Sequence, residues 1–119
     1  MTHNRFGPTV KRLRLEKGMS QKELAEAVGI DFGYLSNIER GRVNPPSGKV
    51  VLRIAKELGV DEDELLVLAR RVPSDIEPII TEGPHIPAVL RRAKGLSEQD
   101  WKKIDEFIQE LKSTAEKEK

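Results

Sequence analysis

Few side chains in this sequence have the chemistry needed for catalysis or for metal binding. The chain has 119 residues, two histidines and no cysteine, which excludes disulfides, thiolate catalysis and cysteine-bound metals. The histidines are His3, near the start, and His85, next to Pro84, and they build neither a catalytic triad nor a histidine-rich metal site. The acidic run from Asp61 to Glu64 is explained by the first turn of a helix, where negative charge is favourable. We therefore expect no enzyme, no metal and no cofactor.

The most informative stretch is QKELAEAVGIDFGYLSNIER, at residues 21–40. It holds two short segments with helical spacing, joined through Gly29, which can adopt a backbone conformation that is costly for other residues. Ala25 is small at the point where two such helices would come closest. The apolar contacts that fix the crossing angle would come from Leu24, Val28, Ile30, Leu35 and Ile38. This arrangement is typical of a helix-turn-helix, whose second helix can enter the major groove of DNA.

Five short helices are expected to position that motif. Capping residues and glycines mark their ends, and we place them, caps included, at residues 6–17, 20–28, 31–40, 47–58 and 61–69. Ser20 and Asp61 each precede a glutamate by three residues, which predicts a capping box. Asp31 and Ser47 are the expected caps of the third and fourth helices. No strand pattern or internal repeat interrupts this series, so the fold class is predicted to be all-α.

The remainder of the chain has a different organisation. Prolines and glycines interrupt residues 71–86, which we interpret as a linker with one helical turn at residues 76–80. A short helix is expected from Pro87 to Gly95. The sequence Ser-Glu-Gln-Asp at residues 97–100 predicts the cap of a last helix of about sixteen residues, followed by a fraying polar tail at residues 112–119. The predicted organisation is therefore a domain at 1–70, a linker at 71–86 and a helical segment at 87–119.

Residues 6–69 resemble the phage-repressor (lambda repressor/Cro-like, XRE) helix-turn-helix family over the whole five-helix domain. The matching pieces are RLR at 12–14, GMSQ at 18–21, ELA at 23–25, VGI at 28–30, YLSNIERG at 34–41, PPS at 45–47 and IAKELGV at 54–60. The resemblance implies a five-helix lambda repressor-like DNA-binding domain. It also implies a sequence-specific DNA-binding transcriptional regulator, with repression the commoner outcome in the family.

Carried over by position, the resemblance implies a set of DNA-binding residues: Gln21, Phe32, Gly33, Tyr34, Ser36, Asn37, Arg40, Arg42 and Asn44. Gln21 and its helix N-terminus would hold a phosphate. Asn37 would pair with adenine and Phe32 would contact a thymine methyl group, whereas Gly33 removes one possible base contact. Tyr34 and the residues after the helix would contact the DNA backbone. The alternatives are packing for Phe32 and Tyr34 and a plain helix-start role for Gln21.

The resemblance also implies an ion pair between Arg14 in the first helix and Glu39 at the end of the recognition helix. We expect this pair to be structural and keep it apart from the DNA contacts. Removing one partner of a buried pair strands the other charge, so the pair would hold the recognition helix in place.

An apolar stripe in the last helix predicts a dimerisation segment. Its members are Trp101, Ile104, Phe107, Ile108 and Leu111. One helix cannot bury such a stripe alone, and DNA half-sites about 34 Å apart call for two copies of the reading domain. The alternative is packing against the chain's own Val89, Leu90 and Leu96.

Charge also separates the two halves, because residues 1–60 carry 11 basic and 6 acidic groups (+5) and residues 61–119 carry 10 and 14 (−4).

The expected partners are a double-stranded DNA operator and a second copy of the chain. A different possibility is an interaction or bridging module that uses the helix-turn-helix without reading DNA. A regulatory partner is a further possibility, either an antagonist or an ImmA/IrrE-type metallopeptidase acting at residues 86–93.

The opening residues lack the apolar core of a secretory signal, and no apolar run is long enough to span a membrane. Together with the absence of cysteine, this predicts a cytoplasmic protein.

Overall fold

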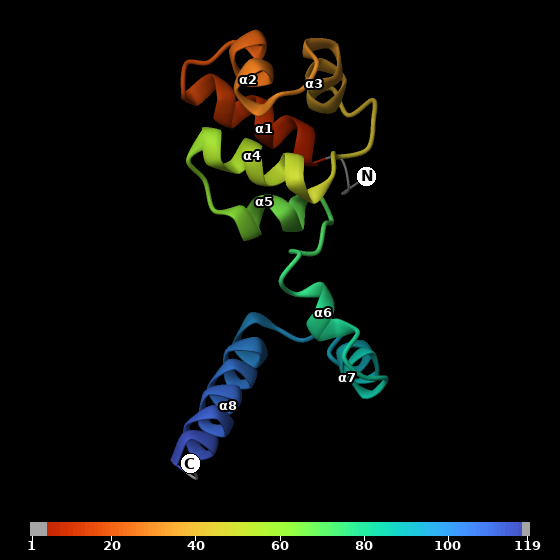
Figure 1. Cartoon of the computed structure of the whole chain (residues 1–119), viewed down its shortest axis with the longest axis vertical. Coiled ribbons are helices and arrows are strands. Elements are labelled where there is room, and N and C mark those ends of the chain that lie inside the picture. The colour runs from red at the N-terminus through yellow and green to blue at the C-terminus, as the bar shows by residue number, and fades with distance from the viewer. Residues whose placement is uncertain (1–4, 118–119) are drawn as a thin grey trace. The chain divides into compact units, whose positions relative to one another are not determined.

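The computed structural model describes residues 5–117, and all eight regular elements in that range are α-helices (Figure 1). The all-α prediction is confirmed. The chain divides into two compact units between Ile79 and Ile80, a point that lies inside the segment 71–86 interpreted above as a linker. The first unit contains α1 (Phe6–Glu16), α2 (Gln21–Val28), α3 (Phe32–Glu39), α4 (Gly48–Leu58) and α5 (Glu62–Leu68). The short helix α6 (Glu77–Ile80) coincides with the helical turn predicted at 76–80.

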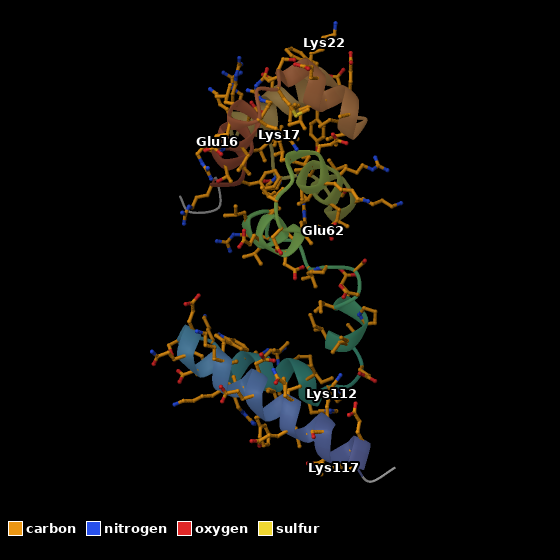
Figure 2. All side chains as sticks on the ribbon, turned by 90° about the vertical axis from the view of Figure 1, so that its left-hand side faces the viewer. Glu16, Lys17, Lys22, Glu62, Lys112 and Lys117 are labelled. Carbon is orange, nitrogen blue, oxygen red and sulfur yellow. The ribbon has the colours of Figure 1, made fainter. Side chains whose placement is uncertain are left out.

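The first unit has one hydrophobic core. Helix α3 packs against α1 and α2, and α4 packs against α2 and α5, so α3 is held by two neighbours. Lys17, labelled in Figure 2, adds a link from the end of α1 to α4 by donating from Nζ to the Glu57 carbonyl oxygen at 2.7 Å. The buried apolar residues are Phe6, Val10, Leu24, Ala25, Val28, Leu35, Ile38, Val51, Ile54, Ala55, Leu58, Leu65, Leu66 and Ala69.

The predicted caps form at most helix starts. The Ser20 hydroxyl accepts from the Glu23 N–H at 3.0 Å, and the Glu23 carboxylate accepts from the Ser20 N–H at 3.0 Å. The pKa of Glu23 is lowered. The main cause is the hydrogen bond that its carboxylate accepts from the Ser20 backbone N–H, and the second cause is a hydrogen bond with the Ser20 side chain. Asp61 accepts from the Glu64 N–H at 3.0 Å without the reciprocal side-chain bond, so only half of that predicted box forms. Ser47 occupies the N-cap of α4 but its side chain makes no capping bond, which corrects that prediction.

A glycine allows α1 and α3 to approach closely. Gly7 lies in the first turn of α1 and is buried. A Cβ at this position would lie 2.2 Å from the carbonyl oxygen of Ile38 and 2.9 Å from that of Glu39, at the end of α3. The absence of a side chain at Gly7 therefore fixes how close the end of the recognition helix lies to α1. Sequence reasoning did not single out this residue, since its importance depends on a contact between segments about 30 residues apart.

The second unit contains α7 (His85–Arg92) and α8 (Glu98–Lys117). The predicted start at Pro87 is two residues late, because Pro87 lies inside the first turn of α7, where its missing N–H costs nothing. The predicted fraying tail is wrong as far as Lys117, since α8 continues through residues 112–117, which are mostly good helix formers. Residues 118–119 of that tail lie outside the described residues. Ser97 and Asp100 cap α8 reciprocally, at 3.1 and 3.2 Å.

Neither helix of the second unit has a buried residue in the described structure. The predicted stripe on α8 is largely solvent-exposed, with Phe107 at 60% and Leu111 at 54% relative exposure. Val89, Leu90 and Leu96 are exposed as well. Among the described helices, none combines the length and the apolar character needed to cross a lipid bilayer.

Candidate nucleic-acid interface

Helix α3 is anchored through one face and open on the other. Leu35, Ile38 and Glu39 are buried, and a helix turns by about 100° per residue. The opposite face therefore presents a row of predicted DNA contacts, namely Gly33, Ser36, Asn37 and Arg40. The Asp31 side chain caps the helix by accepting from the Tyr34 N–H at 3.3 Å, and Gly29 forms the preceding turn with φ of +82°. The sequence thus places a rigid short helix with an outward polar face.

Two aromatic side chains border this row. Phe32 is 53% exposed and Tyr34 is 37% exposed, so neither is a core residue in the free chain. A half-exposed phenylalanine on a polar surface offers an apolar area that can pack against a thymine methyl group. The Tyr34 hydroxyl has no hydrogen-bond partner in the part of the chain that the structure describes and is available to an external acceptor.

The loop after α3 extends the polar surface. Gly41, with φ of +72°, ends the helix, and the Arg42 N–H donates to the Asn37 carbonyl oxygen at 3.0 Å. Arg40, Arg42 and Asn44 are all exposed. Within residues 5–117 their side chains, like that of Asn37, make no hydrogen bond. Two guanidinium groups and two amides are therefore grouped on one helix face and its loop with their donors free.

A buried ion pair holds the end of α3. The Arg14 guanidinium donates to Glu39 through Nε at 2.8 Å and through Nη2 at 3.0 Å, and its Nη1 donates to the Met19 carbonyl oxygen at 2.8 Å. The two side chains are only 7% and 1% exposed. The predicted pair is confirmed, with the fork-to-carboxylate geometry that favours arginine. It connects α1, the turn before α2 and the end of the recognition helix.

Gln21 takes part in this buried network. Its Nε2 donates to the Glu39 Oε1 at 2.9 Å, so one of the two amide hydrogens is used within the chain and one is left for an external group. Gln21 is half-buried, and exposed Lys22 follows it (Figure 2). The link from Gln21 to the ion pair was missed by sequence reasoning. The role of Gln21 toward a phosphate stays a prediction.

A second arginine was also missed. Arg71, which follows α5, donates from Nε to the Pro46 carbonyl oxygen at 2.9 Å and from Nη2 to the Pro45 carbonyl oxygen at 2.6 Å. These prolines belong to the loop that carries Arg42 and Asn44. No sequence signal marks this contact, because the partners are backbone carbonyls 25 and 26 residues away.

The side chains at this surface have the chemistry of nucleic-acid contacts. Within residues 5–117, no group of three or more histidine, cysteine or carboxylate side chains is arranged to hold a metal ion. The accessible groups of α3 and its loop are amide, guanidinium, hydroxyl and aromatic groups, together with the aliphatic side chain of Val43. These groups bind phosphates and the edges of bases.

Comparison with known proteins shows that α3 and the loop after it lie within a stretch that matches a known type of domain. A family model described as "Helix-turn-helix" matches residues 10–65. The uncharacterized HTH-type transcriptional regulator y4dJ of Sinorhizobium fredii is 39% identical over 67 residues, which are 56% of this chain and 86% of the relative. The propionyl-CoA carboxylase regulator of Cereibacter sphaeroides is 34% identical over 84 residues, which are 66% of this chain and 18% of that protein. The chain therefore spans about a fifth of that longer relative.

A solved structure shares the fold. The crystal structure of the clp gene regulator ClgR from C. glutamicum is 31% identical and covers 59% of this chain and 90% of its own, with a TM-score of 0.50. These relatives are regulators and not enzymes, which agrees with the expectation that the chain catalyses no reaction.

Proposed function

The chain belongs to the helix-turn-helix (XRE, Cro/C1-like) family of transcriptional regulators, and from this premise we propose that it is a homodimeric repressor that reads a near-palindromic DNA operator. Helix α3 enters the major groove and the loop after it follows the phosphate backbone. The affinity comes from cationic and helix N-terminal contacts to phosphates, and the sequence preference comes from the outward side chains of α3.

One observation carries this proposal. Helix α3 is anchored by its buried face and by the Arg14–Glu39 pair, while Asn37, Arg40 and Arg42 have free donors on the open side. A helix with a fixed backbone and unused polar groups suits base reading, because the fold already orders the backbone that carries those groups, and only their side chains are ordered on binding. An apolar partner would instead require this surface to be mainly apolar, and among the described residues of α3 and its loop the exposed large apolar side chains are Phe32, Tyr34 and Val43.

The side chains divide into two proposed roles. Asn37 lies one turn after Gly33 on the outward face, where its amide can form two hydrogen bonds with adenine. Arg40 and Arg42 lie at the end of α3 and beyond Gly41, and they neutralise phosphates whatever the sequence. The first role determines which DNA is bound, and the second determines how strongly all DNA is bound.

Selection of bound sequences from a random double-stranded DNA pool tests this function. The full chain is expected to enrich a two-fold symmetric motif with half-sites about one helical turn apart. Asn37→Ala should lose discrimination worth about 1–3 kcal/mol at one base position, and Arg40→Ala should weaken all duplexes and lower the salt slope by about 1. Gln99→Ala, which removes an exposed amide from α8, is the control and should enrich the wild-type motif. No enriched motif, or equal losses for Asn37→Ala and Arg40→Ala at every sequence, would contradict the proposal.

The homodimer is proposed to form through the second unit. Five apolar side chains line one side of α8, and four of them, Trp101, Phe107, Ile108 and Leu111, are exposed in the single chain. Contiguous exposed apolar area of this kind marks an association surface, and a two-fold operator supplies the reason for two copies. In this organisation residues 1–70 read DNA, residues 71–86 connect, and residues 87–119 pair.

Two full-length variants test the dimer. Ile108→Asp places a carboxylate within the stripe, and Ser113→Asp places one on the opposite side of the same helix. By sedimentation equilibrium, Ile108→Asp is expected to halve the mass of the wild-type particle and Ser113→Asp to leave it unchanged. A monomeric wild-type chain, or a dimer insensitive to Ile108→Asp, would refute this assignment.

A further inference from the structure

The end of α5 turns the chain sharply toward the loop that follows α3. Arg70 has φ of +55°, the only positive value at a non-glycine residue in the described chain. The Arg71 N–H donates to the Leu66 carbonyl oxygen at 2.9 Å, and the Arg70 N–H donates to that of Val67 at 3.0 Å. This pattern is a Schellman-type helix end, usually built with glycine at the left-handed position. Here an arginine occupies that strained position, and the next residue is directed back over the first unit.

Arg71 holds the loop that follows α3 by two hydrogen bonds. The Arg71 Nε and Nη2 donate to two consecutive carbonyl oxygens, those of Pro46 and Pro45, at 2.9 and 2.6 Å. A guanidinium presents parallel donors in a fixed plane, so it can hold both acceptors together, whereas an ammonium is a single point charge. Pro46 is itself buried, so the loop is fixed by packing and by this clamp at the same place.

The clamped loop is the one that carries the free cationic and amide groups. Arg42 and Asn44 lie between Gly41, which ends α3, and the two clamped prolines. Their own side chains have no partner in the described chain, so the position of the loop backbone depends on its two ends. The turn at Gly41 fixes one end, and Arg71 fixes the other.

We propose that Arg71 is a positioning residue for DNA binding, which acts by holding the loop 41–47 in the shape that presents Arg42 and Asn44 to phosphates. The inference rests on the proposed DNA-binding function, since it assigns a role within that interface. Arg71 acts through the loop and not by touching the nucleic acid. It also makes the first residue after the reading domain part of the interface, so a domain ending at residue 70 would lack its clamp.

The test uses full-length variants and two readouts. Arg71→Gln and Arg71→Lys remove the two-pronged contact, and the lysine keeps the charge. Arg70→Gln is the control, because it removes a neighbouring exposed arginine whose side chain makes no hydrogen bond in the described structure. Backbone order parameters of Val43 and Asn44 are measured by NMR, and affinity is measured for a mixed-sequence duplex of about 30 base pairs, or three helical turns.

Both Arg71 variants are expected to lower the order parameters toward the flexible range, below about 0.6, and to weaken duplex binding about tenfold, with little change for Arg70→Gln. In a double-mutant cycle with Arg42→Ala, the effect of Arg71→Gln should shrink. Once Arg42 is replaced by alanine, displacing the loop no longer costs a contact between Arg42 and phosphate. Wild-type affinity in Arg71→Lys, or full additivity with Arg42→Ala, would mean a direct phosphate contact and overturn the proposal.

The two proposals fail in different ways. If the wild-type chain binds no duplex, the DNA-binding function fails while the order parameters still report on the clamp. If the order parameters of Val43 and Asn44 are unchanged in both Arg71 variants, the clamp is refuted even when DNA is bound. A melting temperature measured for each variant separates loop loosening from loss of the folded first unit, and Arg71→Lys retains the test if Arg71→Gln unfolds.

Discussion

Gly7→Ala tests how the recognition helix is held against α1. The substitution adds one methyl group at a buried position in the first turn of α1. The new Cβ would lie 2.2 Å from the Ile38 carbonyl oxygen and 2.9 Å from that of Glu39. Since such contacts are essentially never shorter than 3.0 Å, the two backbones must separate by about 0.8 Å, the difference between 3.0 and 2.2 Å. Both obstacles are backbone atoms and cannot rotate away.

Two opposing effects determine the magnitude. Replacing glycine by alanine in a helix gains about 1 kcal/mol in the free energy of unfolding. Inserting a methyl group into a tightly packed contact costs about 1–3 kcal/mol through backbone shifts, and here the shift also moves Glu39, which is hydrogen-bonded to Arg14 and Gln21. Disturbing a buried charge network adds to the cost. We expect the steric and electrostatic costs to win, for a net loss of about 2 kcal/mol.

The assay is equilibrium unfolding of the full chain by urea and by heat, followed by helical circular dichroism. A loss of about 2 kcal/mol corresponds to a fall of about 8–16 °C in the melting temperature of a unit of this size. Gly48→Ala is the matched control, because Gly48 lies at the start of α4 and a Cβ there would only touch Leu66 at the ordinary distance of 3.8 Å. It should be neutral or stabilise by up to about 1 kcal/mol. A melting temperature for Gly7→Ala at or above that of the wild type would refute the reasoning.

Two further predictions concern polar contacts. Glu39→Ala strands the buried Arg14 guanidinium and should lower the free energy of unfolding by about 3–5 kcal/mol; a urea titration showing a loss below about 1 kcal/mol would contradict a buried, coupled pair. Because the folded-state pKa of Glu23 is lowered, its capping contribution is present above its ordinary value of 4.5 and is lost as the pH falls through the lowered value. Melting temperatures measured below pH 4.5 should therefore fall less steeply for Glu23→Gln than for Glu26→Gln, which lies on the same helix outside the box, and equal slopes would count against the Ser20–Glu23 contact.

Local rules account for most of the helical layout. The caps at Ser20, Asp31 and Asp61 and the left-handed glycines at 29 and 59 depend on atoms within a few residues of one another, so the sequence reveals them directly. Local rules failed at the end of α8, where the polar composition suggested fraying. The helix continues to Lys117 because most of these polar residues are good helix formers. They also failed at Ser47, where the residue type is right but the side chain makes no capping bond.

The candidate interface was only partly accessible from the sequence. The residues of the row on α3 and the Arg14–Glu39 pair both followed from resemblance to a family, and helical periodicity explains why the row lies on one face. The participation of Gln21 in that pair and the Arg71 clamp involve partners 18 to 26 residues away, with an amide or a backbone carbonyl at one end. Such contacts leave no periodic trace in the chain.

The existence of the helices, the caps at Ser20, Asp31 and Asp61 and the turn at Gly29 could be predicted from the amino-acid sequence, because each depends on short-range backbone geometry and on the 3.6-residue period. The close approach at Gly7 and the contact of Arg71 with the loop after α3 became visible in the folded chain alone. Those features arise where two segments distant in the chain come within contact distance. Close packing and hydrogen bonding act over a few ångströms of space, whatever the separation along the chain.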